Sequence, residues 1–287
     1  MFRVVILGHG EMLSNLIIGT QDAKCKIVGV FRYERLKTCR IYRKIKDFLW
    51  PSTEYSYIKS YNLPEIKSNS ANSEAFKKEL LKLQPDIVLV GTWSEILKKD
   101  IIQLPKIAMI NAHPSMLPKY RGPNPYLQTI LHKEKNSGLT FHLVTEKLDA
   151  GPILLQKTIE IKPNDTGKEL KQRTVLTARS AVTELLNSLA DDFIIPVDQS
   201  EERATYFPQI KNDDVMLNFK QSAEDIYAHI RAFYPWAKTY FAHKNKFFIP
   251  NPYCIEILEN NTSKQTAGVI VDKSVKDKSI TVVCGDG

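Results

Sequence analysis

Two polar residues stand at the end of an apolar run near the middle of the chain. Asn111 and His113 lie two residues apart in MINAHPSMLPKYRGPNPY (109–126), and Asp149 follows in TEKLDAGPILLQ (145–156). An amide N–H can donate to the oxyanion that forms when a carbonyl carbon becomes tetrahedral. An imidazole can donate there or move protons, and a carboxylate can orient it or accept a proton. Together these three groups suit acyl transfer to an amine.

No cysteine or serine is placed as a nucleophile beside these residues. Direct attack by the amine of the substrate is therefore the simplest chemistry for the set. A structural interpretation is equally open from the residues alone. In it Asn111 caps a turn, His113 packs on a proline, and Asp149 begins a turn before Gly151.

The chain around these residues alternates between two kinds of segment. Apolar runs at 2–8, 26–31, 86–91 and 107–112 are typical of buried strands, and 73–84 and 166–190 have helical patterns, the second with Thr166 as N-cap. This alternation predicts an α/β fold with a doubly wound, mainly parallel, Rossmann-like sheet, to which 138–144 and 153–161 add strands. Ligands of such sheets bind at the carboxyl ends of the strands, where Asn111 and His113 are expected.

The sequence pattern changes after residue 190, where the alternation of strand-like and helix-like segments ends. We predict a catalytic domain at 1–190, a linker at 191–209, which is irregular and polar, and a β-rich domain at 210–287. In the last part a helix at 222–233 precedes short apolar segments at 238–243, 246–249, 253–258, 267–272 and 279–284. This pattern predicts a small OB-like barrel or a sandwich.

Composition narrows the class of protein. The 287 residues carry a net charge of +8, which favours an anionic partner, although many basic proteins bind none. No apolar stretch reaches the roughly 18 residues of a membrane span, and no basic leader precedes the first apolar run, so we expect a cytoplasmic protein that does not enter membranes. The four cysteines are far apart and predict neither disulfides nor a metal site.

The two polar segments resemble a family signature. NAHPSMLPKYRGPNP (111–125), followed by GLTFHLVTEKLDAGPILLQ (138–156), resembles the folate-dependent formyltransferases, whose co-substrate is N10-formyltetrahydrofolate. The resemblance implies that Asn111, His113 and Asp149 are catalytic. It also implies a folate pocket formed by the loop around Asp149, by SMLP (115–118) and by VGTWSEIL (90–97). The candidate pocket residues are Ser115, Met116, Leu117, Pro118, Val90, Gly91, Trp93, Ile96 and Leu97, although Trp93 fits an ordinary core equally well.

Within this family the chain looks most like the methionyl-tRNA formyltransferases. RATYFPQIKNDDVMLNF (203–219) and IRAFYPWAKTYF (230–241) resemble their linker and the start of their C-terminal domain. The resemblance implies formyl transfer to the amine of initiator methionyl-tRNA. An amino-sugar nucleotide or another small amine is the alternative acceptor, and a catalytically silent RNA-binding relative is a second hypothesis. The oligomeric state is left open.

One segment departs from the family pattern. Methionyl-tRNA formyltransferases usually carry a Gly-Arg-Gly-Lys-Lys type of loop after the second strand, whereas this chain has FRYERLKTCRIYRKIKDF (31–48). This stretch could contact the phosphates of tRNA or the diphosphate of a nucleotide-linked sugar, or it could be a solvated basic helix. Its cations are Arg32, Arg35, Lys37, Arg40, Arg43, Lys44 and Lys46.

Overall fold

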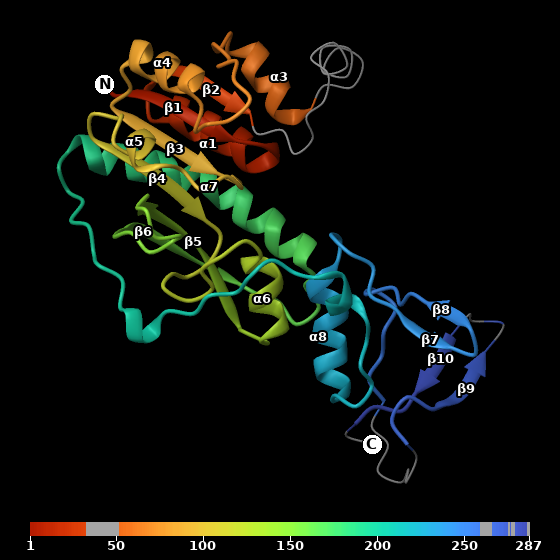
Figure 1. Ribbon diagram of the computed structural model, residues 1–287. Helices are drawn as coiled ribbons and strands as arrows, with labels where there is room; N and C mark the ends of the chain where they lie inside the picture. Colours follow the sequence, from red (N-terminus) through yellow and green to blue (C-terminus); the bar gives the residue numbers. More distant parts are fainter. Residues whose placement is uncertain (33–51, 259–265, 275, 277–278, 286–287) are drawn as a thin grey trace. The chain divides into compact units, whose positions relative to one another are not determined.

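The computed structural model describes residues 1–32, 52–258, 266–274, 276 and 279–285, which are drawn in colour in Figure 1. The chain divides into two compact units. The first comprises Met1–Pro123, Ser137–Ile159 and Gln172–Phe207, and the second comprises Asn124–Asn136, Glu160–Lys171 and Pro208–Gly287. The division into domains at 1–190 and 210–287 with a linker at 191–209 stays a prediction.

A six-stranded sheet with the order β2-β1-β3-β4-β5-β6 forms the centre of the first unit. Its strands are β1 (Arg3–Gly8), β2 (Lys26–Arg32), β3 (Ile87–Gly91), β4 (Ala108–His113), β5 (Asn136–Leu143) and β6 (Ile153–Glu160). β1 pairs in parallel with β2 and β3, and β3 pairs in parallel with β4, whereas β5 runs antiparallel to β4. The predicted α/β fold with a mainly parallel sheet is confirmed.

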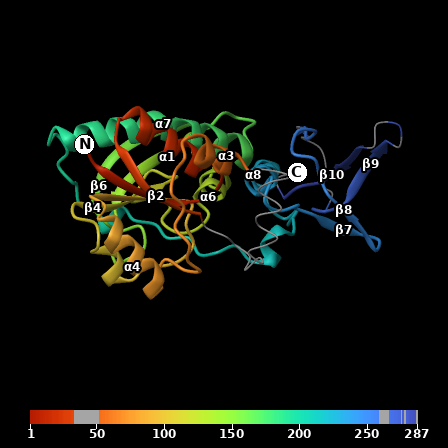
Figure 2. The ribbon, with the colours of Figure 1, turned by 90° about the horizontal axis from the view of Figure 1, so that it is seen from above.

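Helices cover both faces of this sheet. Figures 1 and 2 show α1 (Gly10–Asp22) and the long α7 (Gly167–Ala190) on one face and α4 (Glu74–Leu83) on the other. On the α4 side, Phe76 and Leu80 pack in a core cluster with the sheet residues Val5 and Val88. α1 and α7 come into close contact at Gly19, where a Cβ atom would lie 2.3 Å from the carbonyl oxygen of Arg179.

The N-termini of α4 and α7 are stabilised by capping residues. The Ser73 side chain accepts the N–H of Phe76 at the start of α4. Thr166 acts as predicted at the start of α7: its hydroxyl accepts the N–H of Lys168 (3.2 Å), while Glu169 accepts the N–H of Thr166 (3.0 Å). This reciprocal arrangement satisfies two backbone donors that the first turn of a helix leaves without partners.

The remaining elements are short. The other helices are α3 (Thr53–Ser60), α5 (Lys99–Ile102), α6 (Pro125–Leu131) and α8 (Ala223–Phe233), and two 3-10 turns, Glu201–Arg203 and Asn212–Val215, lie between α7 and α8. In the second unit, β7 (Phe241–His243) pairs antiparallel with β8 (Lys246–Phe248), and β9 (Ile270–Ser274) with β10 (Ser279–Val282). The predicted strand at 253–258 is irregular instead. None of the helices within the described ranges has the length and apolarity needed to cross a bilayer.

Candidate active site

Asn111 and His113 lie inside β4 and share one of its faces. Alternate residues of a strand face the same side, so Ala112, which is buried, points to the opposite face. β3 ends at Gly91, opposite Ala112, but β4 continues because β5 pairs with it as far as His113. The two side chains are thus held by a strand, whereas the sequence pattern places them where a strand gives way to a loop.

His142 lies directly opposite Asn111 on β5. Nδ1 of His142 is 2.9 Å from the carbonyl oxygen of Leu143, which can only accept, so this nitrogen carries the hydrogen of the neutral ring. Nε2 is then an acceptor, and the Asn111 amide nitrogen donates to it at 3.1 Å. His142 therefore fixes the orientation of the Asn111 amide.

Asp149 completes the cluster. Its Oδ1 lies 3.4 Å from Nδ2 of Asn111, 3.6 Å from Nδ1 of His113 and 3.7 Å from Nε2 of His142. The Asp149 side chain is 8% exposed, so this carboxylate oxygen meets three polar nitrogens in a nearly dry environment. The sequence analysis selected Asn111, His113 and Asp149, and the structure brings all three together.

A tight turn holds the carboxylate in place. The N–H of Gly122 donates to Oδ2 of Asp149 at 2.9 Å. Gly122 has φ +109°, and a Cβ atom there would lie 2.2 Å from the carbonyl oxygen of Phe207, so only glycine fits without strain. Asp149 itself has φ +51°.

A residue of the segment 191–209 hydrogen-bonds to the backbone of the Asp149 loop. The Gln199 amide nitrogen donates to the backbone carbonyls of Asp149 (2.9 Å) and Gly151 (2.7 Å). Oε1 of Gln199 in turn accepts from the Arg121 guanidinium at 2.9 and 3.1 Å, and Arg121 also pairs with Glu201 at 3.1 Å. The sequence carries no motif that marks Gln199, because its role depends on a contact between segments about fifty residues apart.

Burial and nearby polar groups set the protonation states. Burial, the largest influence, would raise the pKa of Asp149, but the positive charge that His113 carries when it is protonated and the Gly122 N–H act in the opposite direction, and the pKa is held at about 2. Burial lowers the pKa of His113 more than the Asp149 charge raises it. The site thus combines a carboxylate with a neutral His113. Because Nε2–H of His113 donates to the Tyr120 carbonyl at 2.9 Å, its free lone pair is on Nδ1 and faces Asp149.

Comparison with known proteins assigns the family. A family model for formyl transferase matches residues 2–186, and a model for the formyl transferase C-terminal domain matches residues 209–287. The chain belongs to the formyltransferase family.

Relatives and solved structures agree with this assignment. A methionyl-tRNA formyltransferase of Thermotoga maritima is 33% identical over 231 residues, which are 80% of this chain and 72% of the relative. A methionyl-tRNA formyltransferase of Stutzerimonas stutzeri is 28% identical over 295 aligned positions, which cover 99% of this chain and 87% of the relative. An N-formyltransferase from Helicobacter canadensis, solved with folinic acid and dTDP-3-aminofucose, superposes with a TM-score of 0.67 at 20% identity, covering 85% of each chain. This last similarity shows a common fold.

The candidate folate residues of this formyltransferase fall into two groups. Val90 and Gly91 end β3, and Val90 is paired in register with Asn111. Trp93 packs its ring on Phe31 with centroids 5.3 Å apart, and Leu97 is buried in the core cluster behind the sheet. Ile96, in contrast, is 71% exposed. Within this loop Trp93 and Leu97 contribute to the core, which was the alternative for Trp93, and Ile96 presents an apolar surface.

The loop after β4 is the second group. Ser115 and Leu117 are buried, and Met116 and Pro118 are partly buried. The N–H of Leu117 donates to Oγ1 of Thr140 at 3.3 Å, which ties the loop to β5. This burial and the hydrogen bond give Ser115 and Leu117 a structural role in the loop next to His113.

Of the seven cations in the basic stretch that departs from the family pattern, only Arg32 lies in the described residues. It is buried, with Nε 2.7 Å from Oε2 of Glu65 and its guanidinium 4.8 Å from the centre of the Tyr55 ring. Arg32 thus pairs within the fold, whereas the sequence analysis placed it in a stretch that either contacts phosphates or forms a solvated basic helix. The other six residues lie outside the described residues.

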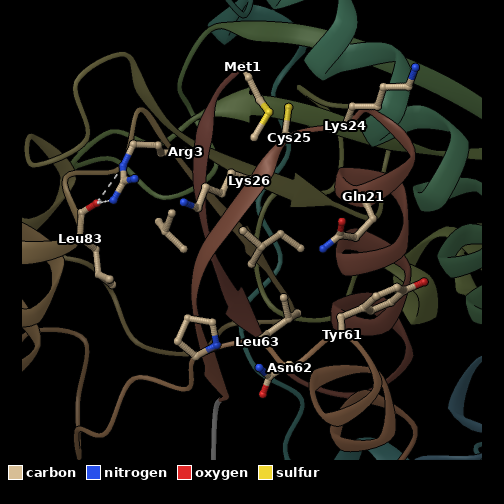
Figure 3. Close-up of a pocket in the computed structure, with 13 residues that line it drawn as sticks. Met1, Arg3, Gln21, Lys24, Cys25, Lys26, Tyr61, Asn62, Leu63 and Leu83 are labelled. Atoms are coloured by element: carbon tan, nitrogen blue, oxygen red, sulfur yellow. Dashed lines mark hydrogen bonds between the residues drawn. The ribbon is translucent and has the colours of Figure 1, made fainter.

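A cavity of about 770 Å³ lies elsewhere in the first unit (Figure 3). It is lined by residues at the amino ends of β1 and β2, including Met1, Arg3 and Lys26, together with Tyr61 and Asn62. The carboxyl ends of these parallel strands, and β4 with Asn111, face the opposite edge of the sheet. The cavity is therefore separate from the cluster of Asn111, His113 and Asp149. Across the described residues, no group of three or more His, Cys, Asp or Glu side chains is arranged to hold a metal ion.

Proposed function

We propose that this formyltransferase moves the formyl group of N10-formyltetrahydrofolate to the α-amine of initiator methionyl-tRNA, a reaction of translation initiation in the cytoplasm. The observation that carries the proposal is the meeting of Asn111, His113 and His142 around one oxygen of Asp149, at 3.4 to 3.7 Å. A donor, a proton acceptor and a carboxylate in a nearly dry site are the groups that formyl transfer to an amine requires.

Asn111 is the proposed oxyanion donor. As the amine nitrogen forms its bond to the formyl carbon, the carbonyl electrons move to oxygen, and an amide N–H can stabilise that charge. One N–H of Asn111 is engaged by His142 at 3.1 Å, whereas the contact with Asp149 is longer, at 3.4 Å. The hydrogen facing Asp149 is therefore the one that is available to the formyl oxygen.

Asp149 and His113 are the proposed proton acceptors. The attacking amine must lose a proton, and Nδ1 of the neutral His113 can take it directly or through water. The resulting imidazolium would lie 3.6 Å from the Asp149 carboxylate, which favours its formation. The same proton can then pass to the departing N10 nitrogen, so that the formamide product and tetrahydrofolate leave with no net change at His113.

The loops beside the cluster fit a flat heterocycle. Lys99 and Glu146 form an ion pair at 3.1 Å, which brings the segment after β3 next to the loop that carries Asp149. Both segments expose an apolar side chain, with Ile96 71% and Leu148 45% exposed. Apolar walls with a few polar groups are typical of pockets that bind a ring such as a pterin.

The acceptor is proposed from the relatives. The relatives from Thermotoga maritima and Stutzerimonas stutzeri are named methionyl-tRNA formyltransferases, and the second alignment spans 99% of the chain. An amino-sugar nucleotide remains the alternative, because structures of sugar N-formyltransferases share the fold.

A direct assay separates the two acceptors. The purified protein is supplied with N10-formyltetrahydrofolate and, in parallel reactions, with charged initiator methionyl-tRNA or an amino-sugar nucleotide. We expect formylation of the methionyl-tRNA only. Formylation of the sugar nucleotide without formylation of the tRNA would show that the proposed acceptor is wrong. If neither reaction depends on Asn111 and Asp149, the proposed site is wrong as well.

A further inference from the structure

The cavity at the amino ends of β1 and β2, which we call the edge cavity, places two cations next to each other (Figure 3). Arg3 on β1 and Lys26 on β2 are paired in register in the parallel sheet, and both line the cavity. Like charges at paired positions of neighbouring strands repel each other, which destabilises the sheet. An anion held between Arg3 and Lys26 would replace this repulsion with two attractive contacts.

No carboxylate forms an ion pair with either cation in the described part of the chain. The guanidinium of Arg3 donates to the backbone carbonyl of Leu83 at 2.6 and 3.2 Å, and Lys26 has no ion pair there. Asp86 accepts the backbone N–H of Arg3 at 2.7 Å but forms its own ion pair with Lys106 at 3.5 Å. The lining of the edge cavity contains no Asp or Glu. Both cations are therefore available to an anion from outside the chain.

The remaining lining combines apolar side chains with amides. Ile27 and Val28 of β2, each 6% exposed, line the cavity together with Leu63. Figure 3 shows the amide of Gln21, in the last turn of α1, directed toward the middle of the cavity, and Asn62 lines it as well. Apolar walls with a few polar groups, in a volume of about 300 to 1,000 Å³, are typical of sites for small molecules. The edge cavity, at about 770 Å³, has both properties.

The edge of β2 is open inside the cavity. β2 ends the strand order of the sheet, and among the described residues its outer edge is bridged at Val30 alone, by Glu65. Backbone groups between Lys26 and Val28 therefore have no strand partner on that side. This open stretch is shorter than the about five or six residues of a typical strand, and Pro64 covers the edge beyond it by accepting the Val30 N–H at 2.9 Å. The edge cavity thus suits a small molecule better than a peptide added as a further strand.

We propose that the edge cavity binds a small organic anion with an apolar body, either a carboxylate or a phosphate ester. The charged group lies between Arg3 and Lys26, and the apolar body packs on Ile27 and Val28. The open edge of β2 and the Gln21 amide supply hydrogen bonds to polar atoms of the body. This site goes beyond the proposed formyl transfer and does not depend on it, because the cluster around Asp149 lies at the opposite edge of the sheet.

The test uses anilinonaphthalene sulfonate, an anion with apolar rings that fluoresces at apolar sites, as the probe. Phenylnaphthylamine has the same rings without the sulfonate and is the neutral probe. Lys26→Gln removes one cation, and Lys78→Gln, at an exposed position of α4 outside the cavity, is the matched control. Lys26→Gln should weaken binding of the anionic probe about fivefold and leave the neutral probe unchanged, whereas the control should match the wild type. Equal affinities of the two variants for the anionic probe, or equal losses of both probes in Lys26→Gln, would overturn the proposal.

Charge reversal gives a second readout that needs no probe. Lys26→Glu provides Arg3 with a carboxylate, so it should raise Tm by roughly 2 °C and abolish binding of the anionic probe. A Tm no higher than that of Lys78→Glu would contradict the repulsion on which the proposal rests.

Displacement of the anionic probe from the wild type distinguishes the two kinds of anion. Naphthyl phosphate and naphthoate carry the same rings, and naphthol is their neutral control. We expect at least one of the two anions to displace the probe at a concentration at which naphthol does not. Displacement by neither anion, or equally well by naphthol, would show that the edge cavity does not select an organic anion. None of these measurements involves formyl transfer, so their results are independent of whether methionyl-tRNA proves to be formylated.

Discussion

Asn111 on β4 and His142 on β5 stand directly opposite each other, and the amide nitrogen of Asn111 lies 3.1 Å from Nε2 of His142. Since the other ring nitrogen of His142 donates to a backbone carbonyl, the tautomer and the amide orientation are both determined. The proposed oxyanion donor is therefore aligned before any substrate binds, which limits reorganisation during the reaction.

Replacing Asn111 should remove the oxyanion donor. We expect Asn111→Ala to lower kcat by about 10²–10³ while folate affinity changes little, because the lost hydrogen bond forms mainly in the transition state. Steady-state kinetics together with equilibrium binding of a folate analogue check this. The control is Asn187→Ala, an exposed position on α7, which should retain wild-type activity. An unchanged kcat in Asn111→Ala would contradict the assigned role.

His142 should act as a positioning residue. His142→Leu removes the acceptor for the Asn111 amide, so we expect kcat to fall roughly tenfold, as misplaced catalytic groups do, with KM nearly unchanged. His142→Gln supplies an amide oxygen that can accept the same hydrogen bond and should restore much of the lost rate. Equal losses in both variants would indicate that His142 only fills space.

Asp149 should make stability depend on pH in a defined window. Its pKa of about 2 in the folded protein lies below the ordinary 3.8, so the folded state favours the carboxylate. The contribution of the Asp149 carboxylate to the free energy of unfolding is complete above about pH 4 and is lost as the pH falls toward 2. The difference between its folded and unfolded pKa values corresponds to about 2 kcal/mol. Urea unfolding of the wild type and of Asp149→Asn between pH 6 and 2 measures it. We expect the wild type to lose about 2 kcal/mol more than the variant, and parallel curves would refute the assignment.

Gln199 should affect catalysis from outside the cluster. Gln199→Leu leaves the carbonyls of Asp149 and Gly151 without their donor and should shift the Asp149 loop. We expect a stability loss of about 1–3 kcal/mol and a fall in kcat of roughly tenfold or more. Gln103→Leu, at an exposed position after α5, is the matched control. A stability loss with kcat unchanged would mean that Gln199 has no part in positioning Asp149.

Much of the fold could be predicted because it depends on local patterns. The strands at 2–8, 26–31 and 86–91 are mostly apolar because both faces of the sheet are covered, and each of these three lies within one residue of the observed strand at either end. The helix at 166–190 was predictable from its periodicity and from Thr166. In the second unit the exposed strands are short and only weakly patterned, and the segment at 253–258 is irregular despite its apolar residues.

The sequence by itself determined the chemical groups of this protein: Asn111, His113 and Asp149 are recognisable by type, spacing and resemblance. Only the tertiary structure decided what surrounds them. His142 has the pattern of an ordinary strand histidine until antiparallel pairing of β5 with β4 places it opposite Asn111. Gln199 likewise depends on a contact between segments far apart in the chain. Local patterns record which face of an element is buried, whereas the identity of a partner across the fold is set only when the chain packs.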